Sequence, residues 1–377
     1  MATNWQIKKL GEVLNIQNGY AFDSKKFSND EGIPLIRIRD LKNGISTETR
    51  YVGDYDEKYV VHNGDFLIGM DGEFICYQWK VSGALLNQRV CRLQNFSNLL
   101  YPRFLFYAIN KHLKEIEDVT AYITVKHIAS KQIANIEIPL PPFSEQQRIV
   151  KILDGVFENV ANVKENTEKN LQNSKELFES YLRSIFANPG KDWEEKRLGD
   201  VCKVIAGQSP EGKFYNKLGK GLPFYQGKKE FGEKYIGKPT TWTTNITKEA
   251  IENDILMSVR APVGPINFAT QKICIGRGLA AIRSEKDIDK NFMFYGILSK
   301  EKEIVGNTGA VFASINKNNI ENLEFFIPSL AAQKSIVKKL DALSAETKKL
   351  EAIYKQKLAD LEELKKSVLK KAFNGEL

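Results

Sequence analysis

Hydrophobic and polar residues follow one order in the first part of this chain, and the order is that of a strand-rich domain. Short apolar runs such as residues 33–39 and 65–70 are separated by turns that contain Gly, Asn and Asp, a pattern that predicts β-strands. Between residues 101 and 117, apolar side chains recur at spacings of three and four, which predicts a helix with one buried face.

The same order returns in the second part of the chain. The motif at residues 5–13 reappears at residues 193–201, and the motif at residues 149–154 reappears at residues 336–341. A repeat of this length far exceeds the roughly 20 to 50 residues of a solenoid unit, so each copy is expected to be a whole domain followed by a connecting helix. Between these motifs the copies differ greatly, which indicates one scaffold with different surface loops.

Each copy ends in an apolar exit strand with prolines, and a long helix with a heptad rhythm follows it. The heptad positions are Leu153, Val156, Val160, Val163, Thr167, Ser174, Leu177 and Tyr181 in the first helix, and Leu340, Leu343, Thr347, Leu350, Tyr354, Leu361, Leu364 and Val368 in the second. An amphipathic rod of about 40 residues, or roughly 60 Å, is rarely stable alone. We expect the two helices to pair antiparallel within the chain; a parallel coiled coil between two chains is the alternative.

These patterns predict an α+β fold with pseudo-twofold symmetry. Two similar strand-rich domains, residues 1–142 and 188–330, are expected to be separated by two long antiparallel coiled-coil helices, residues 143–187 and 331–377.

Composition narrows the class of protein. The chain has 377 residues, of which 42% are hydrophobic and 27% charged, as in ordinary folded proteins. Four scattered cysteines and three scattered histidines suggest neither a disulfide framework nor a metal centre. The absence of a long apolar run and of a signal pattern predicts a cytoplasmic protein without a membrane span. The net charge of +8 is compatible with a polyanionic partner.

Motifs for catalysis are weak. Residues 207–214 superficially match a phosphate-binding loop, but Phe214 replaces the Ser or Thr that would bind magnesium, and Pro210 lies inside the loop. Neither a dinucleotide fingerprint nor a distinct pair of catalytic carboxylates follows from the sequence. We therefore expect neither a catalytic residue nor a metal ligand, although an unfamiliar active site is an open alternative.

Basic residues lie beside aromatic residues in several predicted loops, a combination that suits contacts with phosphates and base edges. For any single one, a solvated surface charge is as good an interpretation, and Arg37 could lie along a buried strand. Arg89 and Arg277 are assigned to matching places in the two copies, for a shared backbone contact or a shared ion pair. The predicted DNA-binding residues are Lys25, Lys26, Arg37, Arg39, Arg89, Lys126, His127, Lys213, Tyr215, Lys228, Lys229, Arg260, Arg277, Asn316 and Lys317.

Five motifs in a fixed order give the chain a resemblance to a known family. They are residues 10–13 with their second copy at 198–201, 19–22 leading to 32–37, 64–68, 138–150 and 369–377. Over almost its whole length, the chain resembles the specificity subunit (HsdS) of type I restriction-modification systems. The second copy departs from the pattern at residues 329–333, which lack the second proline and the Glu-Gln pair.

The resemblance implies two target recognition domains, each reading one half of a bipartite asymmetric site in double-stranded DNA. It also implies a non-catalytic subunit that recruits two methyltransferase subunits, with restriction and translocase subunits joining later. No cofactor is expected on this chain, because S-adenosylmethionine, ATP and Mg would be held by the partner subunits. The alternatives are a self-sufficient DNA methyltransferase or nuclease, and a coiled-coil scaffold with no role at DNA.

Overall fold

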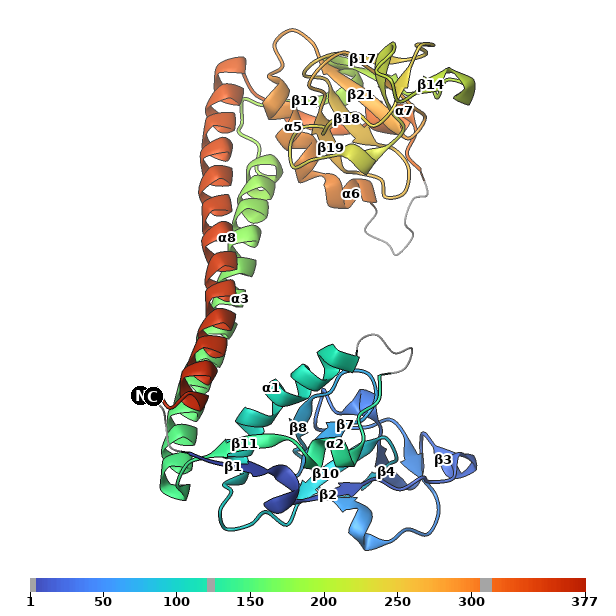
Figure 1. The fold of residues 1–377 in the computed structure, drawn as a ribbon. Helices are drawn as coiled ribbons and strands as arrows, with labels where there is room; N and C mark the ends of the chain where they lie inside the picture. The colour runs from blue at the N-terminus through green and yellow to red at the C-terminus, as the bar shows by residue number, and fades with distance from the viewer. Residues whose placement is uncertain (1–4, 121–125, 306–313) are drawn as a thin grey trace. The chain divides into compact units, whose positions relative to one another are not determined.

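A computed structural model describes residues 5–120, 126–305 and 314–377 (Figure 1). The contacts between residues group the chain into two compact units, Met1–Asn166 with Leu358–Leu377, and Thr167–Lys357. Each unit contains one strand-rich domain together with a part of each long helix. The boundaries expected from the sequence, which set the helices apart as separate domains, stay a prediction.

The first domain consists of three small sheets and a long helix, α1 (Pro102–Thr120). The strands nearest its two ends, β1 (Gln6–Lys9) and β11 (Glu137–Leu140), pair antiparallel and close the domain. A four-stranded sheet has the order β2 (Asn15–Asn18), β10 (Val90–Gln94), β7 (Phe66–Gly69), β8 (Cys76–Gln78). A five-stranded sheet has the order β3 (Phe27–Ser28), β5 (Arg50–Tyr51), β4 (Ile33–Ile36), β9 (Ala84–Leu86), β6 (Val60–Val61).

The second domain repeats this arrangement strand for strand. Strands β12 (Glu194–Arg197) and β22 (Glu324–Ile327) close it. Its sheets have the orders β13 (Cys202–Ala206), β21 (Leu279–Ser284), β18 (Ile255–Ser258), β19 (Ile266–Phe268), and β14 (Tyr215–Asn216), β16 (Trp242–Thr243), β15 (Leu222–Tyr225), β20 (Ile273–Ile275), β17 (Glu249–Ala250). The prediction of one scaffold used twice is therefore confirmed.

The helices of the two domains differ in length. The first domain has α1 and a short helix, α2 (Ser130–Ala134), whereas the second has α4 (Leu198–Val201), α5 (Lys290–Ser299), α6 (Glu301–Val305) and α7 (Lys317–Glu321). The apolar face expected at residues 101–117 is the core face of α1, where Phe104, Leu105, Ile109 and Leu113 are buried. Because this face covers the same core as the sheets, the helical period and the strand pattern agree on one buried side.

Two glycines at matching places permit a close backbone approach in each domain. A Cβ atom at Gly19 would lie 2.0 Å from the carbonyl oxygen of Asn87, and one at Gly207 would lie 2.1 Å from that of Gly276. Real Cβ atoms do not come so close, so any side chain here would push the segment away from the strand ends. The glycine of the motif Gly19-Tyr20-Ala21-Phe22 is therefore explained by the close packing of this loop against the backbone at Asn87.

The long helices α3 (Phe143–Ala187) and α8 (Leu330–Phe373) pair antiparallel within each unit. In the first unit, Lys164 forms an ion pair with Glu362 at 3.1 Å, and the Arg148 guanidinium donates a hydrogen bond to the carbonyl oxygen of Leu377 at 2.8 Å. Residue numbers therefore rise along one helix as they fall along the other. In the second unit, Leu182 of α3 and the early α8 residue Leu340 belong to one core, as antiparallel pairing requires.

The heptad prediction is right for much of each helix and wrong for four positions. Among the predicted positions, Leu153, Val160, Thr167, Ser174, Leu340, Thr347 and Leu361 are buried, whereas Leu177, Tyr181, Leu350 and Leu364 are exposed. Near the exposed positions of α3, the half-buried Phe178 and the buried Leu182 face the core instead. A straight helix drifts by roughly 20° per heptad, so the buried stripe moves to the next residue over several turns.

One buried glutamine anchors each long helix to its domain. Gln146, which is 0% exposed, donates to the carbonyl oxygens of Leu99 (2.8 Å) and Pro141 (2.9 Å) and accepts from the Tyr101 amide (2.8 Å). Gln333 repeats the set, donating to Asp287 (3.0 Å) and Pro328 (2.9 Å) and accepting from the Asp289 amide (2.8 Å). The different sequence at residues 329–333 therefore preserves the anchor.

A second matching contact joins each helix to its domain. The Tyr107 hydroxyl donates a hydrogen bond to Asp154, and the Tyr295 hydroxyl donates one to Asp341 at 2.6 Å. Burial, followed by the bond to Asp154, raises the pKa of Tyr107 to about 12, and the same two causes raise the pKa of Tyr295. Both hydroxyls therefore keep their protons, and hence these bonds, throughout the neutral pH range.

Substitution of Gln146 by leucine is expected to lower the free energy of unfolding of the first domain by about 2–4 kcal/mol, because three buried backbone groups lose their partner. The neighbouring Gln147 is exposed, so Gln147→Leu is a matched control with an expected change below about 0.5 kcal/mol. Urea unfolding of the two variants measures the difference. Equal losses would contradict the anchoring role.

Other global expectations concern membranes, metals and thiols. Among the described helices, none is long and apolar enough to cross a membrane. The described residues contain no group of three or more His, Cys, Asp or Glu side chains arranged to hold a metal ion. All four cysteines are buried free thiols, as the scattered spacing suggested.

Candidate nucleic-acid interface

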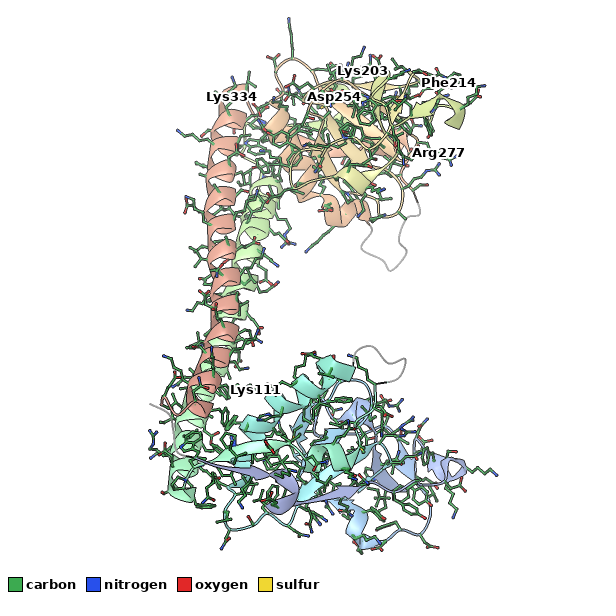
Figure 2. All side chains as sticks on the ribbon, in the orientation of Figure 1. Lys111, Lys203, Phe214, Asp254, Arg277 and Lys334 are labelled. Atoms are coloured by element: carbon green, nitrogen blue, oxygen red, sulfur yellow. The ribbon has the colours of Figure 1, made fainter. Side chains whose placement is uncertain are left out.

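The predicted DNA-binding residues lie at the surfaces of the two domains. Figure 2 labels one of them, Arg277, at the margin of the second domain. Every one is exposed except Lys126 and Tyr215, which are half-buried. Exposure alone does not distinguish them, because lysine and arginine are exposed in most proteins. The hydrogen bonds and ion pairs of each side chain distinguish candidates that are available to a ligand from candidates that already bind another part of the protein.

Arg37 and Arg39 follow strand β4 and do not continue it. The strand ends at Ile36, and the turn Ile38–Asp40 begins where the Asp40 carboxylate accepts a hydrogen bond from the Arg37 amide at 2.9 Å. The expectation of a strand up to residue 39 is therefore wrong. Arg37 is exposed beyond the strand end, whereas the Arg39 guanidinium donates to the Thr49 hydroxyl at 3.1 Å.

Lys25 and Lys26 belong to a short turn before strand β3. The Asp23 carboxylate accepts a hydrogen bond from the Lys25 amide at 3.0 Å and fixes the turn Ser24–Lys26. Both side chains are exposed, so this pair suits phosphate contacts better than the reading of base edges.

One aspartate and one glutamate contact the remaining candidates of the first domain. Asp71 Oδ1 lies 2.6 Å from His127 Nδ1 and 3.5 Å from Arg89 Nη1. The Lys126 ammonium donates to the buried carboxylate of Glu117 at 3.0 Å, and this bond lowers the pKa of Glu117 against the effect of its burial. Lys126 is thus the counter-charge of a buried carboxylate, which favours a structural role.

A cleft in the second domain brings together three candidates, Tyr215, Lys229 and Arg277. It has a volume of about 790 Å³ and is also lined by Ser209, Phe224, Gln226, Glu230 and Thr240. The Tyr215 ring stacks on Phe224 with 4.7 Å between centroids, and its hydroxyl donates to the Pro210 carbonyl at 2.9 Å. Aromatic faces beside cationic and amide groups are the combination that holds nucleobases.

Lys213 is engaged by its neighbours. Its ammonium lies 2.6 Å from the Glu211 carboxylate and 5.1 Å from the centre of the Phe214 ring. The turn Gly212–Phe214 leads into strand β14 and not into a helix, so the phosphate-loop interpretation of residues 207–214 fails. Lys228 begins the next exposed turn, Lys228–Glu230, next to Lys229 of the cleft.

The last three candidates have local structural roles. The Asn316 side chain accepts from the Asn319 amide at 2.9 Å and caps helix α7. Lys317 forms an ion pair with Glu321, four residues further along the helix, at 3.3 Å. Arg260 forms a backbone bridge with Ser314, the counterpart of the bridge between Asp71 and His127.

Strand register corrects the match between Arg89 and Arg277. Val90 pairs with Gly69 in the first domain, and Leu279 pairs with Ser258 in the second. Because Gly69 and Ser258 lie at the ends of equivalent strands, Arg89 corresponds to Gly278, and Arg277 corresponds to Gln88. The two arginines therefore do not occupy equivalent places.

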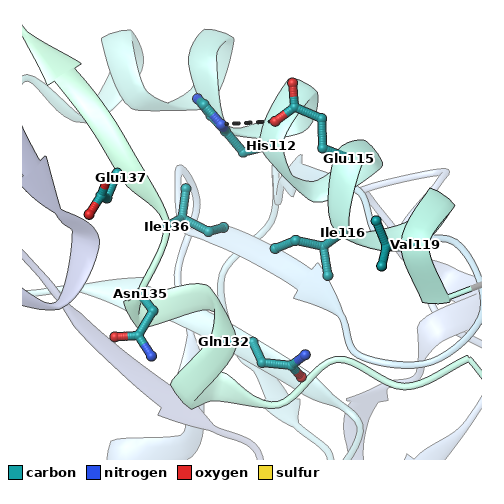
Figure 3. A pocket seen from close by; sticks show the side chains of 8 residues that line it. All are labelled: His112, Glu115, Ile116, Val119, Gln132, Asn135, Ile136 and Glu137. Carbon is teal, nitrogen blue, oxygen red and sulfur yellow. Dashed lines mark ion pairs between the residues drawn. The ribbon is translucent and has the colours of Figure 1, made fainter.

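A groove in the first domain is bordered by a different set of side chains (Figure 3). It has a volume of about 660 Å³ and is lined by His112, Glu115, Ile116, Val119, Gln132, Asn135, Ile136 and Glu137. His112 Nδ1 lies 3.4 Å from a Glu115 carboxylate oxygen, and burial lowers the pKa of His112. None of the predicted DNA-binding residues lines this groove.

Comparison with known sequences gives full-length similarity. The chain matches the type I restriction modification DNA specificity domain over residues 2–173 and 190–362. It is 32% identical to a putative type I restriction enzyme MjaX specificity subunit of Methanocaldococcus jannaschii, over 99% of this chain and 94% of that protein. It is 28% identical to the type I restriction enzyme EcoBI specificity subunit of Escherichia coli, over 99% of this chain and 86% of that protein.

Solved structures agree with the sequence matches. A chain from a study of complex assembly and conformational transition of the type I R-M system superposes with a TM-score of 0.81 at 28% identity, covering 100% of this chain and 99% of that one. The HsdS subunit of Thermoanaerobacter tengcongensis superposes with a TM-score of 0.68 at 26% identity, covering 100% and 98%. The fold and the sequence therefore point to the same group of proteins.

Proposed function

Because this chain belongs to the type I restriction-modification DNA specificity family, we propose that it selects the bipartite DNA sequence on which a type I complex acts. Each strand-rich domain is a target recognition domain that reads one half of the site. The protein supplies recognition, while methylation and cleavage belong to other subunits of the complex.

The observation that carries this proposal is that one scaffold presents two different surfaces. The sheets of both domains have the same strand orders. The second domain has a cleft lined by Tyr215, Lys229 and Arg277, whereas the first has the exposed Arg37 and an Asp71 side chain that contacts His127. Sequence readout requires different donor and acceptor patterns for different bases. A duplicated scaffold with unlike surfaces therefore suits an asymmetric site with two unlike halves.

The helices suit the recruitment of two identical partners. Gln146 and Gln333 anchor the starts of α3 and α8 by the same three hydrogen bonds, so the two helix entries are alike although their sequences differ. We propose that two methyltransferase subunits bind at these two sets of equivalent elements and that restriction and translocase subunits join them. S-adenosylmethionine, ATP and Mg would be held by those subunits. The complex would act in the cytoplasm, where its DNA is found.

The test combines this chain with its methyltransferase subunit. Methylome sequencing of cells that carry both is expected to show one bipartite motif, and cells that carry the methyltransferase subunit alone are expected to lack it. The purified chain alone, given DNA, Mg and S-adenosylmethionine, is expected to bind DNA with a strong salt dependence and without turnover. Turnover by the chain alone would favour a self-sufficient methyltransferase or nuclease.

A further inference from the structure

We propose that one arginine and one glutamine form the base-reading pair of each domain, and that their places are exchanged between the domains. The pairs are Arg37 with Gln88 in the first domain and Gln226 with Arg277 in the second. The inference rests on the proposed function, because it names the residues by which each half-site is read.

Parallel strands bring the members of each pair to one sheet edge. In the first domain β4 and β9 run parallel, with Ile36 opposite Leu86, and the chain leaves them toward Arg37 and Gln88. In the second domain β15 and β20 run parallel, with Tyr225 opposite Ile275, and the chain leaves them toward Gln226 and Arg277. Because the carboxyl ends of parallel strands lie on the same edge, each domain presents one arginine and one glutamine there.

A loop that contains Tyr20 in the first domain, and an equivalent loop that contains Gln208 in the second, cross this sheet edge. The Tyr20 amide donates to the carbonyl of Leu86 at 3.0 Å, and the Gln208 amide donates to that of Ile275 at 3.0 Å. In the first domain the bond from the Gln88 amide to the Tyr20 carbonyl, 2.7 Å long, holds Gln88 at the edge. The four residues therefore lie at corresponding places of one framework.

A single hydroxyl joins the two members of the second pair. Ser209 Oγ donates to Gln226 Oε1 at 2.9 Å and accepts from the Arg277 amide at 3.2 Å. Both residues line the cleft beside the Tyr215 and Phe224 rings. The amide nitrogen of Gln226 has no described hydrogen bond and can donate to a ligand.

The charged and amide groups of the pairs are available for binding. All four residues are exposed, and among the described residues no hydrogen bond or ion pair engages the guanidinium of Arg37 or Arg277, or the side-chain amide of Gln88. Lys213 and Lys317, by contrast, would have to leave carboxylate partners before contacting DNA. Free polar groups lose no protein partner when they turn toward a base.

The chemistry of the two side chains fits two different purines. An arginine fork donates to O6 and N7 of guanine, and a glutamine amide donates to N7 and accepts from N6 of adenine, in the major groove. Because the arginine follows the β4-type strand in the first domain and the β9-type strand in the second, the guanine and adenine readers are transposed. In the first half-site, guanine should be read at the end of the β4-type strand and adenine at the end of the β9-type strand. In the second half-site, the two bases should be read at the opposite strand ends.

The experiment exchanges the members of one pair. The full chain with its methyltransferase subunit is used to select from a library of randomised duplex DNA, and affinities are then measured on duplexes with single base changes. Arg37→Gln with Gln88→Arg is expected to transpose the guanine and adenine preferences in the first half-site and to leave the second half-site unchanged. Gln226→Arg with Arg277→Gln should do the converse. Each original preference should fall by roughly ten- to a hundredfold.

The double variants are compared with a control variant, Lys42→Gln, and with the unaltered chain. Lys42→Gln removes one exposed positive charge from the first domain and should leave the selected sequence unchanged. If both double variants keep the original bases and only bind all sequences more weakly, the pairs contact phosphates and the inference is overturned. If the unaltered chain selects no sequence at all, the proposed function itself fails, and the two failures are thus distinct.

Discussion

Replacement of residues 5–139 by the same segment of a relative with a different target is expected to change one half of the recognised DNA sequence and to leave the other half unchanged. The segment carries its own closing strands, because β1 and all of β11 except Leu140 lie within it and pair with each other. Its core lies in the first unit and shares no residue with the core cluster of the second domain. The bases of one half-site should therefore depend on this segment alone.

The exchange needs contacts that the donor must preserve. Backbone groups of Leu99 and Tyr101 bind Gln146, and the Phe104 ring packs on Phe373 of α8 with 5.3 Å between centroids. A segment from a relative that keeps the backbone course at residues 99–101 and an apolar side chain at position 104 should pack on the unchanged helices. Exchange of residues 193–326 is the matched experiment, and it should change the opposite half-site. Altered bases in both halves after either exchange would contradict independent reading.

Substitution of Arg92 by alanine is expected to destabilise the first domain by about 3–5 kcal/mol, because the buried guanidinium loses its ion pair with the half-buried Asp65 together with its other hydrogen bonds. Arg92 is only 8% exposed and donates five hydrogen bonds. One goes to the Asp65 carboxylate at 2.9 Å, two go to Gln17, and two go to backbone carbonyl oxygens. The substitution removes the cationic partner of Asp65, whose carboxylate keeps only the hydrogen bond from the His62 amide, and it removes the guanidinium donor to Gln17 and the Val60 carbonyl. These losses are the source of the cost.

Arg50→Ala is the control for this substitution. The Arg50 guanidinium donates to the Gly32 carbonyl oxygen from a half-buried position, and its loss should cost about 1 kcal/mol. Thermal unfolding monitored by tryptophan fluorescence, together with hydrogen exchange, would measure the loss of stability in each of the two variants. Arg92→Ala should also leave protection within the second domain unchanged, since the two domains have separate cores. A similar small loss for both variants would contradict the buried role of Arg92.

The sequence predicted the scaffold well because the scaffold depends on local and repeated patterns. Apolar runs with turn residues located β4 and β7, and the three-and-four spacing located α1. The paired helices followed from heptads, but the buried stripe at Phe178 and Leu182 did not, because the drift of a straight helix accumulates over several turns.

The site was less predictable because the partner of a charged side chain is set by tertiary contacts. Lys126 meets a glutamate on α1, and Arg89 and His127 meet Asp71, and neither carboxylate is near them in sequence. Exposed glutamines give no signal in one sequence, so Gln88 and Gln226 became candidates only when strand register was known.

The DNA sequence selected by the unaltered chain shows whether each domain reads one half of a bipartite site. The full chain, bound to its methyltransferase subunit, would be offered randomised duplex DNA, and the retained duplexes would be sequenced. Two recognition domains with unlike surfaces should retain two short specified segments of different sequence, separated by a gap of fixed length in which all bases are equally represented. A single continuous motif, two identical halves, or retention without any sequence preference would contradict the proposed function.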